Sequence, residues 1–282
     1  MNRRRLLSTA LAAALPGFLS VTALAGAMVT GRPALAREPM LDRIRARGTI
    51  RVGTTGDYFP YSFRDVRSGS FIGHDVDLAK RLAADLGVGV EFVQATWPTI
   101  VAGLRAGKYD IAASGITITP ERARAVAFSR SYLSPAFVAI VPATAAAGYA
   151  SWRDLDRPGI TISLQQGTAP ETAAKRAFTQ ARLVSVMEPV IDFTEVLAGR
   201  ADATITDNLY FATKIRSEYP QLAMVGGEPL AEAETGLMTR QGEEALVAWI
   251  DAWIGERKAD GFLDQLYRTW FEAGGAGAGG AR

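Results

Sequence analysis

The sequence predicts an α/β protein built from two mostly parallel sheets, and three observations support this prediction. Strand-like and helix-like patterns alternate from residue 49 to residue 113. The alternation starts again near residue 137 and continues to residue 216. A chain of 282 residues is also long enough for two units of about 100 residues each. Strand–helix–strand repeats favour parallel strands with helices on the faces of the sheet.

The first unit is expected to contain three strands separated by two helices. A short helical lead-in over 41–47 precedes it, and 56–61 is expected to be a loop because Pro60 interrupts the strand pattern. Apolar residues recur at helical spacing over 79–86, and Gly87 follows as a helix stop. The expected strands are Thr49–Gly53, Val90–Val93 and Asp110–Ala113, and the expected helices begin near Asp75 and Ile100.

The second unit repeats this arrangement and is followed by a helical segment. Its expected strands are Phe137–Val141, Ile160–Leu164, Ala181–Val184 and Ala203–Thr206, and its expected helices are Pro170–Phe178, Ile191–Leu197 and Asn208–Arg216. A strand at 235–239 and a helical stretch over 243–270, broken at Gly261, complete the pattern.

Composition excludes several classes of protein. The chain has no cysteine, which excludes disulfide scaffolds, thiolate metal sites and cysteine nucleophiles. It has one histidine, His74, so a histidine-rich metal site or a Ser/His/Asp triad would depend on that residue alone. We expect neither a metal site nor a cofactor. Four arginines lie in residues 1–36, which leaves 27 of the 31 basic residues against 29 acidic ones. This nearly neutral body argues against nucleic acid as a partner.

The first 36 residues are typical of a secretory signal. Arg3-Arg4-Arg5 precedes the apolar stretch 6–30, and small-residue cleavage patterns end at Ala25 or Ala36. The arginine pair leaves open a twin-arginine route beside the general secretory one. An uncleaved membrane anchor is the alternative, although Pro16 and Gly17 interrupt the stretch. No later segment has 18 consecutive apolar residues, so we expect an exported protein whose mature form is not embedded in the membrane.

Candidate ligand-binding residues lie in the loops that follow the predicted strands. Ligands of open parallel sheets bind outside the carboxyl ends of the strands, and two such units side by side would form a cleft. The candidates are Asp57, Tyr58, Tyr61, Trp97, Ser114, Gly115, Thr117, Arg122, Gly167, Thr168, Asp207 and Tyr210.

The loop from Ser114 to Arg122 carries the strongest chemistry. The arginine fork matches a carboxylate, the hydroxyls of Ser114 and Thr117 can donate to it, and a ligand can approach the peptide N–H groups around Gly115. The alternative is a plain helix start, with Thr119 as N-cap, Pro120 in the first turn and a solvated arginine. The cap does not exclude the carboxylate receptor.

The remaining candidates each have a structural alternative. Asp207 follows a strand and can accept from an ammonium group, or it can cap the next helix. Trp97 can stack on a ligand or pack in the core. Gly167 and Thr168 can donate N–H groups to an anion, or form an ordinary strand-to-helix turn.

The chain resembles the family 3 periplasmic solute-binding proteins, the amino-acid-binding components of ABC importers, over about 41–271. The motifs that carry the resemblance are Arg51–Thr55, Gly73–Ala79, Gly107–Ile111, Ser114–Arg122, Phe128–Ser129, Gly199–Ala203 and Thr206–Asp207. The resemblance implies a type II periplasmic binding protein fold, with two lobes joined by hinge strands near 137–141 and 230–235. Lobe 1 would comprise 37–138 and 234–273, lobe 2 would comprise 139–233, and 274–282 would be a disordered tail.

The resemblance also implies roles for particular residues. Arg122, Ser114 and Thr117 would bind an α-carboxylate, Asp207 the α-amino group, and Trp97 would stack on the side chain. The implied ligand is a small amino acid or related carboxylate, and the implied partners are the membrane subunits of an ABC importer. A sensor that signals to a membrane receptor is a further alternative, which only a partner would reveal.

A narrower resemblance links the chain to the cyclohexadienyl dehydratases, enzymes on the same fold that act on prephenate or arogenate. It is carried by Thr54–Tyr58, Thr96–Pro98 and Ser114–Ile116. Aligned without gaps, the enzymes carry Glu where this chain has Tyr210, Lys where it has Phe137 and Asn where it has Leu164. The reaction needs a general acid, and the candidates here are Tyr210, Asp207 and Glu171. The sequence thus favours a binding protein without catalytic residues, with the dehydratase as the alternative.

Overall fold

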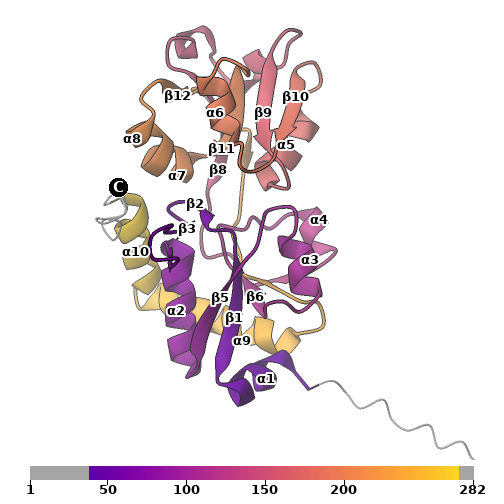
Figure 1. Ribbon diagram of the computed structural model, residues 1–282, viewed down its shortest axis with the longest axis vertical. Helices are drawn as coiled ribbons and strands as arrows, with labels where there is room; N and C mark the ends of the chain where they lie inside the picture. Colours follow the sequence, from indigo (N-terminus) through magenta and orange to yellow (C-terminus); the bar gives the residue numbers. More distant parts are fainter. Residues whose placement is uncertain (1–37, 273–282) are drawn as a thin grey trace, which may run out of the picture. The chain divides into compact units, whose positions relative to one another are not determined.

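A computed structural model describes residues 38–272 (Figure 1). The predicted secretory signal, 1–36, and the predicted tail, 274–282, lie outside the described residues. The fold is α/β, with two larger sheets and a small third one, which confirms the predicted class. In the part of the chain that is described, no helix combines the length and the apolar character that crossing a membrane requires.

The first sheet has the strand order β5-β1-β6-β14-β7. Its strands are β1 (Thr49–Thr54), β5 (Gly89–Gln94), β6 (Ile111–Ala112), β7 (Ala127–Phe128) and β14 (Met238–Thr239). β1 lies between β5 and β6 and is parallel to both. The late strand β14 runs antiparallel to β6 and β7. The three strands predicted for the first unit are therefore confirmed.

Alternate residues of this sheet face two different cores. Ile111 and Ala113 pack with residues of α2 and α9, whereas Ala112 packs with residues of α3. This alternation is what a strand covered on both faces requires. The helices around this sheet are α1 (Met40–Arg47), α2 (His74–Leu86), α3 (Ile100–Arg105), α4 (Pro120–Ala123), α9 (Glu244–Ala259) and α10 (Phe262–Tyr267), followed by the π-helical turn η4 (Arg268–Glu272). The predicted break at Gly261 is confirmed, because its φ of 80° separates α9 from α10.

The second sheet has the order β10-β9-β11-β8-β12, and β13 pairs with β8. Its strands are β8 (Ala136–Pro142), β9 (Thr161–Gln165), β10 (Arg182–Val186), β11 (Ala203–Asp207), β12 (Leu222–Met224) and β13 (Ala231–Glu232). β9 is parallel to β10 and β11, whereas β8 is antiparallel to β11. Figure 1 shows these strands with the helices that accompany them.

This sheet is also covered on both faces. Phe137, Ala139 and Val141 of β8 pack with residues of α5. Val138 and Ile140 pack instead with the helical segment that begins at α7. The helical elements are α5 (Ala169–Ala177), α6 (Asp192–Leu197), α7 (Asn208–Tyr210), the π-helical turn η3 (Phe211–Ile215), α8 (Arg216–Glu218) and the short 3₁₀ turns η1 (Ala146–Gly148) and η2 (Trp152–Leu155). We call the layers around the first sheet lobe 1 and those around the second sheet lobe 2.

The loop predicted over 56–61 is in part a strand, and that expectation was wrong. β2 (Asp57–Tyr58), β3 (Ser62–Arg64) and β4 (Phe71–Ile72) form a small antiparallel sheet. Ser62 organises its start, because its hydroxyl lies 2.6 Å from that of Thr54 and accepts the N–H of Gly56 at 2.9 Å. These contacts join residues up to eight positions apart and leave no periodic pattern in the sequence.

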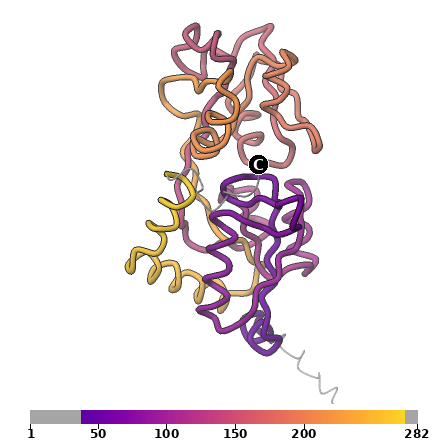
Figure 2. The backbone as a smooth tube through the Cα atoms, turned by 60° about the vertical axis from the view of Figure 1, so that its left-hand side comes forward, coloured from indigo at the N-terminus to yellow at the C-terminus, as the bar shows by residue number. Residues whose placement is uncertain are grey.

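Two segments connect the lobes, one after β7 and one before β14. Thr235 of the second segment pairs with Leu133 of the first, so the segments run side by side (Figure 2). The predicted second hinge, 230–235, overlaps its connection. The predicted first hinge, 137–141, was misplaced, because those residues pair with β11 and β12 inside the second sheet. The proposed lobe boundaries stay a prediction, although the one at 138 falls within β8.

The close packing of Tyr109 on β1 generates a prediction about stability. A Cβ on Gly53 would lie 2.5 Å from the Tyr109 ring, whereas a Cβ on Gly89 would meet its nearest atom at 3.6 Å. Gly53→Ala should therefore lower the free energy of unfolding by about 1–3 kcal/mol, the usual cost of overpacking. Gly89→Ala, on the neighbouring strand, is the matched control and should change it by less than about 0.5 kcal/mol. Urea denaturation measures both, and equal effects would contradict the prediction.

Candidate ligand-binding site

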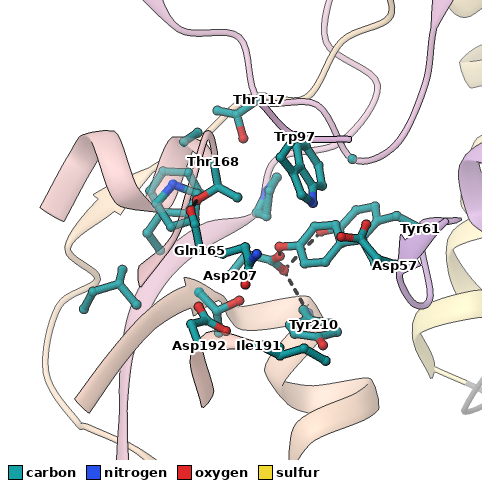
Figure 3. A pocket seen from close by; sticks show the side chains of 18 of the residues that line it. Asp57, Tyr61, Trp97, Thr117, Gln165, Thr168, Ile191, Asp192, Asp207 and Tyr210 are labelled. Atoms are coloured by element: carbon teal, nitrogen blue, oxygen red, sulfur yellow. Dashed lines mark hydrogen bonds between the residues drawn. The ribbon is translucent and has the colours of Figure 1, made fainter. Parts of the chain in front are cut away.

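A cavity of about 510 Å³ is lined by both lobes. Its walls come from the segments that follow β1, β5, β6, β9, β10 and β11, as expected for the carboxyl ends of parallel strands. The lining residues predicted from the sequence are Asp57, Tyr58, Tyr61, Trp97, Gly115, Thr117, Arg122, Thr168, Asp207 and Tyr210. The side chain of Asp207 points from lobe 2 toward the tyrosine rings (Figure 3).

Arg122 brings a half-buried positive charge to the cavity. Its Nη1 donates to the carbonyl oxygen of Thr117 at 3.0 Å, and its Nη2 donates across the lobes to the carbonyl of Gly167 at 3.2 Å. Burial lowers the pKa of Arg122 to about 10. Within residues 38–272 no carboxylate lies within ion-pair distance of its guanidinium. The predicted cap is also present, since the Thr119 hydroxyl accepts the N–H of Arg122 at 3.2 Å, but the arginine is half-buried rather than fully solvated.

Asp207 fills the capping role weighed from the sequence, and its carboxyl also lines the cavity. Its Oδ1 accepts the N–H groups of Leu209 at 2.9 Å and Tyr210 at 2.8 Å, which caps α7. The same oxygen accepts the Tyr61 hydroxyl at 3.1 Å, and Oδ2 accepts the Tyr58 hydroxyl. Burial raises the pKa of Asp207. Both tyrosines come from lobe 1, so this carboxyl joins the two walls of the cavity.

Aromatic rings form one wall of the cavity. Tyr58 stacks on Tyr61 with ring centroids 4.9 Å apart, meets Trp97 edge-on at 5.5 Å and lies 4.8 Å from Tyr210. Trp97 also packs with residues of α3, so it lines the cavity and belongs to the core. Burial raises the pKa of Tyr210 well above its ordinary value, which makes this residue a poor proton donor.

Two residues predicted at the site, Ser114 and Gly167, do not line the cavity. The N–H group of Gly115, which was predicted to be open to a ligand, already donates a hydrogen bond within the protein. Ser114 is fully buried, and its hydroxyl lies 2.7 Å from that of Thr55. Gly167 contributes its carbonyl to Arg122 rather than its N–H to an anion, because that N–H donates to Glu171 at 2.7 Å. Gly115 lines the cavity, but its N–H donates to Asp75 at 2.6 Å.

The candidate acid Glu171 is occupied by structural contacts. It is buried outside the cavity lining, where it accepts from Lys175 at 2.6 Å and from the Ser185 hydroxyl. Burial alone would raise its pKa, but the hydrogen bonds from Lys175, Ser185 and Gly167 outweigh burial and lower it. Glu171 is therefore a carboxylate that holds the start of α5, and its lowered pKa does not favour the proton-donor role.

Two carboxyl residues at the cavity were missed. Glu188 follows β10, and the hydrogen bond that its protonated carboxyl donates to Asp57, together with burial and the charge of Asp57, raises its pKa to about 7. Asp192 starts α6, and burial raises its pKa to about 6 even though it accepts the Thr204 hydroxyl at 2.8 Å. The rule that selected the other loops applies to both, but the predicted strand ended at Val184, two residues before the observed end at Val186.

The charges of the lining residues are unequal. Four carboxyl groups line the cavity, from Asp57, Glu188, Asp192 and Asp207, whereas Arg122 is the one cationic side chain among the described lining residues. Asp57 and Glu188 lie on the exposed rim, one from each lobe. The interaction of such a charge with a ligand is stronger where the cavity excludes water. The cavity therefore favours a ligand with one anionic group and more than one cationic group.

Comparisons with known proteins agree with this geometry. The chain is 32% identical over 237 residues to the cyclohexadienyl dehydratase of Pseudomonas aeruginosa, which covers 84% of this chain and 88% of the enzyme. The crystal structure of an ancestral amino acid-binding protein, a precursor of cyclohexadienyl dehydratase, has 39% identity and a TM-score of 0.75, over 82% of this chain and 99% of that one. A binding component of an ABC transporter from Wolinella succinogenes, complexed with lysine, has 33% identity and a TM-score of 0.74, over 80% and 96% of the chains.

The family comparison covers most of the chain. The sequence profile of the bacterial extracellular solute-binding proteins, family 3, matches residues 50–273. This match confirms the resemblance found in the sequence motifs and agrees with the two-lobed arrangement of the sheets. The chain belongs to family 3 of the bacterial extracellular solute-binding proteins.

Proposed function

We propose that the protein captures an amino acid with a cationic side chain in the periplasm and delivers it to an ABC importer. The observation that supports this proposal is the charge of the cavity, which places one guanidinium among four carboxyl groups. An amino acid with a cationic side chain carries one carboxylate and two cationic groups, which complements that arrangement. The lysine complex of the Wolinella succinogenes relative supports the same class of ligand.

The ligand carboxylate would bind Arg122. A guanidinium has five N–H donors, of which two are used here by the carbonyls of Thr117 and Gly167. The remaining donors can meet a carboxylate through the paired geometry that makes arginine selective for it. The hydroxyl of Thr117, which lines the cavity, is a further donor.

The ligand ammonium would bind Asp207. Oδ1 of this residue already accepts three donors, whereas Oδ2 accepts from Tyr58 alone among the contacts of the described residues. A carboxylate oxygen can accept about two hydrogen bonds. Oδ2 is therefore the atom at which an ammonium would join or replace the Tyr58 hydroxyl.

The cationic side chain would meet Asp57 and Glu188 at the rim of the cavity. Asp57 is an acceptor for the protonated Glu188 carboxyl, so Glu188 keeps its proton up to a pKa of about 7. A ligand ammonium or guanidinium supplies donors of its own and would make that proton unnecessary. Trp97 and the tyrosines would pack on the aliphatic part of the side chain, as aromatic faces do beneath a cation.

A dehydratase is the second candidate function. The relative from Pseudomonas aeruginosa favours it, as does Glu188, whose pKa of about 7 leaves it largely protonated in mildly acidic solution. The charge of the cavity opposes it, because prephenate carries two carboxylates and would face four carboxyl groups with one guanidinium. Tyr210, which stands where the enzymes carry Glu, is a weaker acid than a free tyrosine. We therefore favour the binding protein.

Removing the Arg122 guanidinium tests the carboxylate site. Arg122→Ala should weaken the binding of arginine or lysine at least tenfold, because a charge-assisted hydrogen bond contributes about 1.5–3 kcal/mol. Arg122→Lys should fall between this variant and the unchanged protein, since lysine keeps the charge without the fork. Arg124→Ala is the matched control, because Arg124 is 71% exposed two residues away. Calorimetric titration measures each affinity, and undiminished binding by Arg122→Ala would remove this site.

The carboxyl pair at the rim makes binding depend on pH. Glu188 loses its negative charge as the pH falls through about 7, so the affinity for lysine should fall roughly fourfold between pH 8.5 and pH 6.5 if only the ionised form binds. The side-chain ammonium of lysine stays charged over this range. Glu188→Gln should bind more weakly at pH 8.5 and lose most of this slope.

Two controls separate this effect from a general pH effect. Glutamine lacks the side-chain cation, so any binding of it should stay nearly constant over the same range. Glu218→Gln removes an exposed carboxylate that pairs with Lys214 at 2.6 Å, and this variant should keep the slope. An unchanged slope in Glu188→Gln would contradict the assigned role of the carboxyl pair.

Incubation with prephenate and with arogenate distinguishes the two candidate functions. We expect no aromatic product above the rate of the uncatalysed reaction, measured by absorbance over hours at micromolar protein. The positive control is a dehydratase assayed in the same buffer. Turnover that disappears in Glu188→Gln would establish the enzyme and replace the binding function proposed here.

A further inference from the structure

Asp75 is a buried carboxyl that the proposed ligand contacts do not use. Its side chain is 0% exposed and lies in the first turn of α2. A carboxylate removed from water must find hydrogen-bond donors nearby, because an unpartnered one is very costly. Two hydrogen-bond donors to Asp75 come from distant parts of the chain, and a third contact is with the adjacent His74.

The first donor is the cavity loop. The N–H of Gly115 donates to Oδ2 of Asp75 at 2.6 Å. Gly115 lines the cavity, between the end of β6 and the two residues assigned to the ligand carboxylate, Thr117 and Arg122. This hydrogen bond spans 40 positions in the sequence. The carboxyl of Asp75 thus holds the loop from which the carboxylate-binding residues extend.

The second donor comes from a segment that connects the lobes. The hydroxyl of Tyr132 donates to the same Oδ2 at 2.6 Å. The N–H of Tyr132 in turn donates to the carbonyl of Thr235, in the other connecting segment, at 3.1 Å. Burial, followed by the influence of Asp75, raises the pKa of Tyr132 well above its ordinary value, so the hydroxyl keeps its proton and remains a donor.

The surrounding contacts fix the carboxyl in place. Nδ1 of His74 lies 2.8 Å from Oδ1, and the His74 ring stacks on Tyr132 with centroids 5.9 Å apart. The N–H of Asp75 donates to the carbonyl of Tyr61 at 2.9 Å, and Tyr61 itself donates to Asp207. One carboxyl oxygen therefore joins a connecting segment to a cavity loop, while the backbone of the same residue holds a tyrosine of the cavity wall.

We propose that Asp75 is a positioning residue that links the segment connecting the lobes, through Tyr132, to the cavity loop at Gly115. This inference rests on the proposed function for its effect on ligand binding. When the connecting segment is in the arrangement seen here, Tyr132 and Gly115 share Oδ2, and the loop that carries Arg122 is held in its binding geometry. Losing the Tyr132 hydroxyl would loosen that loop although this side chain does not line the cavity.

Tyr132→Phe tests the link directly. The variant keeps the ring that stacks on His74 and removes the hydroxyl alone. Measured without added ligand, amide hydrogen exchange at Gly115 should be at least fivefold faster in the variant. Exchange at Val52, in β1 of the first sheet, should change little. In the same variant the Kd for lysine should rise about tenfold. Asp75→Asn should show the same pattern, because the amide weakens the acceptor.

Tyr109→Phe is the matched control for loss of a buried hydroxyl. Tyr109 is 1% exposed and donates to the carbonyl of Ile100, in the core of lobe 1 and away from Asp75. This variant should lose stability and keep both the Gly115 exchange rate and the Kd. Equal effects of Tyr109→Phe and Tyr132→Phe at Gly115 would show general loosening and overturn the link.

The two readouts separate failure of this inference from failure of the proposed function. Unchanged Gly115 exchange in Tyr132→Phe overturns the link, whatever the protein binds. Faster exchange at Gly115, in a protein that binds no amino acid even without substitution, would support the link and contradict the proposed function. Faster exchange with an unchanged Kd in a protein that does bind lysine would also overturn the positioning role.

Discussion

The half-buried guanidinium of Arg122 is the constraint on which the rest of the cavity depends. A charge removed from water needs compensation, and here two backbone carbonyls, one from each lobe, provide it in part. A carbonyl group carries no net charge, so the positive charge of Arg122 remains available to an anionic ligand group. The lowered pKa of about 10 expresses the same fact, because burial without a carboxylate partner disfavours the charged form. The ligand carboxylate would be the partner that residues 38–272 do not supply.

Two carboxyl groups of lobe 2 have backbone N–H donors as partners, whereas the partners of Arg122 are backbone carbonyls. Asp207 and Asp192 are buried carboxyls whose pKa values are raised by burial, and each receives hydrogen bonds from backbone N–H groups at a helix start. Asp207 caps α7, and Asp192 lies in the first turn of α6, where the helix dipole favours negative charge. Secondary structure thus places acidic groups on the wall of lobe 2, opposite the arginine of lobe 1.

The sequence predicted most of the fold, because the main strands and helices carry local patterns. β1, β5 and β9 could be found from alternation, and α2 from its helical repeat and the glycine that ends it. The small sheet of β2, β3 and β4 could not be found, because two- and three-residue strands have no period and depend on pairing with a distant segment.

At the candidate site, too, the sequence predicted the residues that local patterns place and missed contacts between distant segments. Ten of the predicted residues line the cavity because the ends of parallel strands meet at one edge. Glu188 was missed through a strand end placed two residues early, a local error. The N–H of Gly115 was misjudged for a different reason, since its acceptor is 40 positions away and no local pattern records that contact. Hydrogen bonds between residues far apart in the sequence cannot be predicted from a local pattern.

Three positions, 137, 164 and 210, bear on the choice between a binding protein and a dehydratase. Tyr210 and Phe137 line the cavity, but Leu164 is buried in the core of lobe 2, so only two of the three differences would touch a ligand. Both put aromatic rings on the lobe 2 wall. The acidic proton that remains is on the carboxyl pair at the rim, where Asp57 holds it in a hydrogen bond. A proton shared by two carboxyls is bound more tightly than a proton on one carboxyl alone. A cationic ligand group that replaces this proton can interact with both carboxylates. This chemistry suits binding of a cation better than donation to a leaving group.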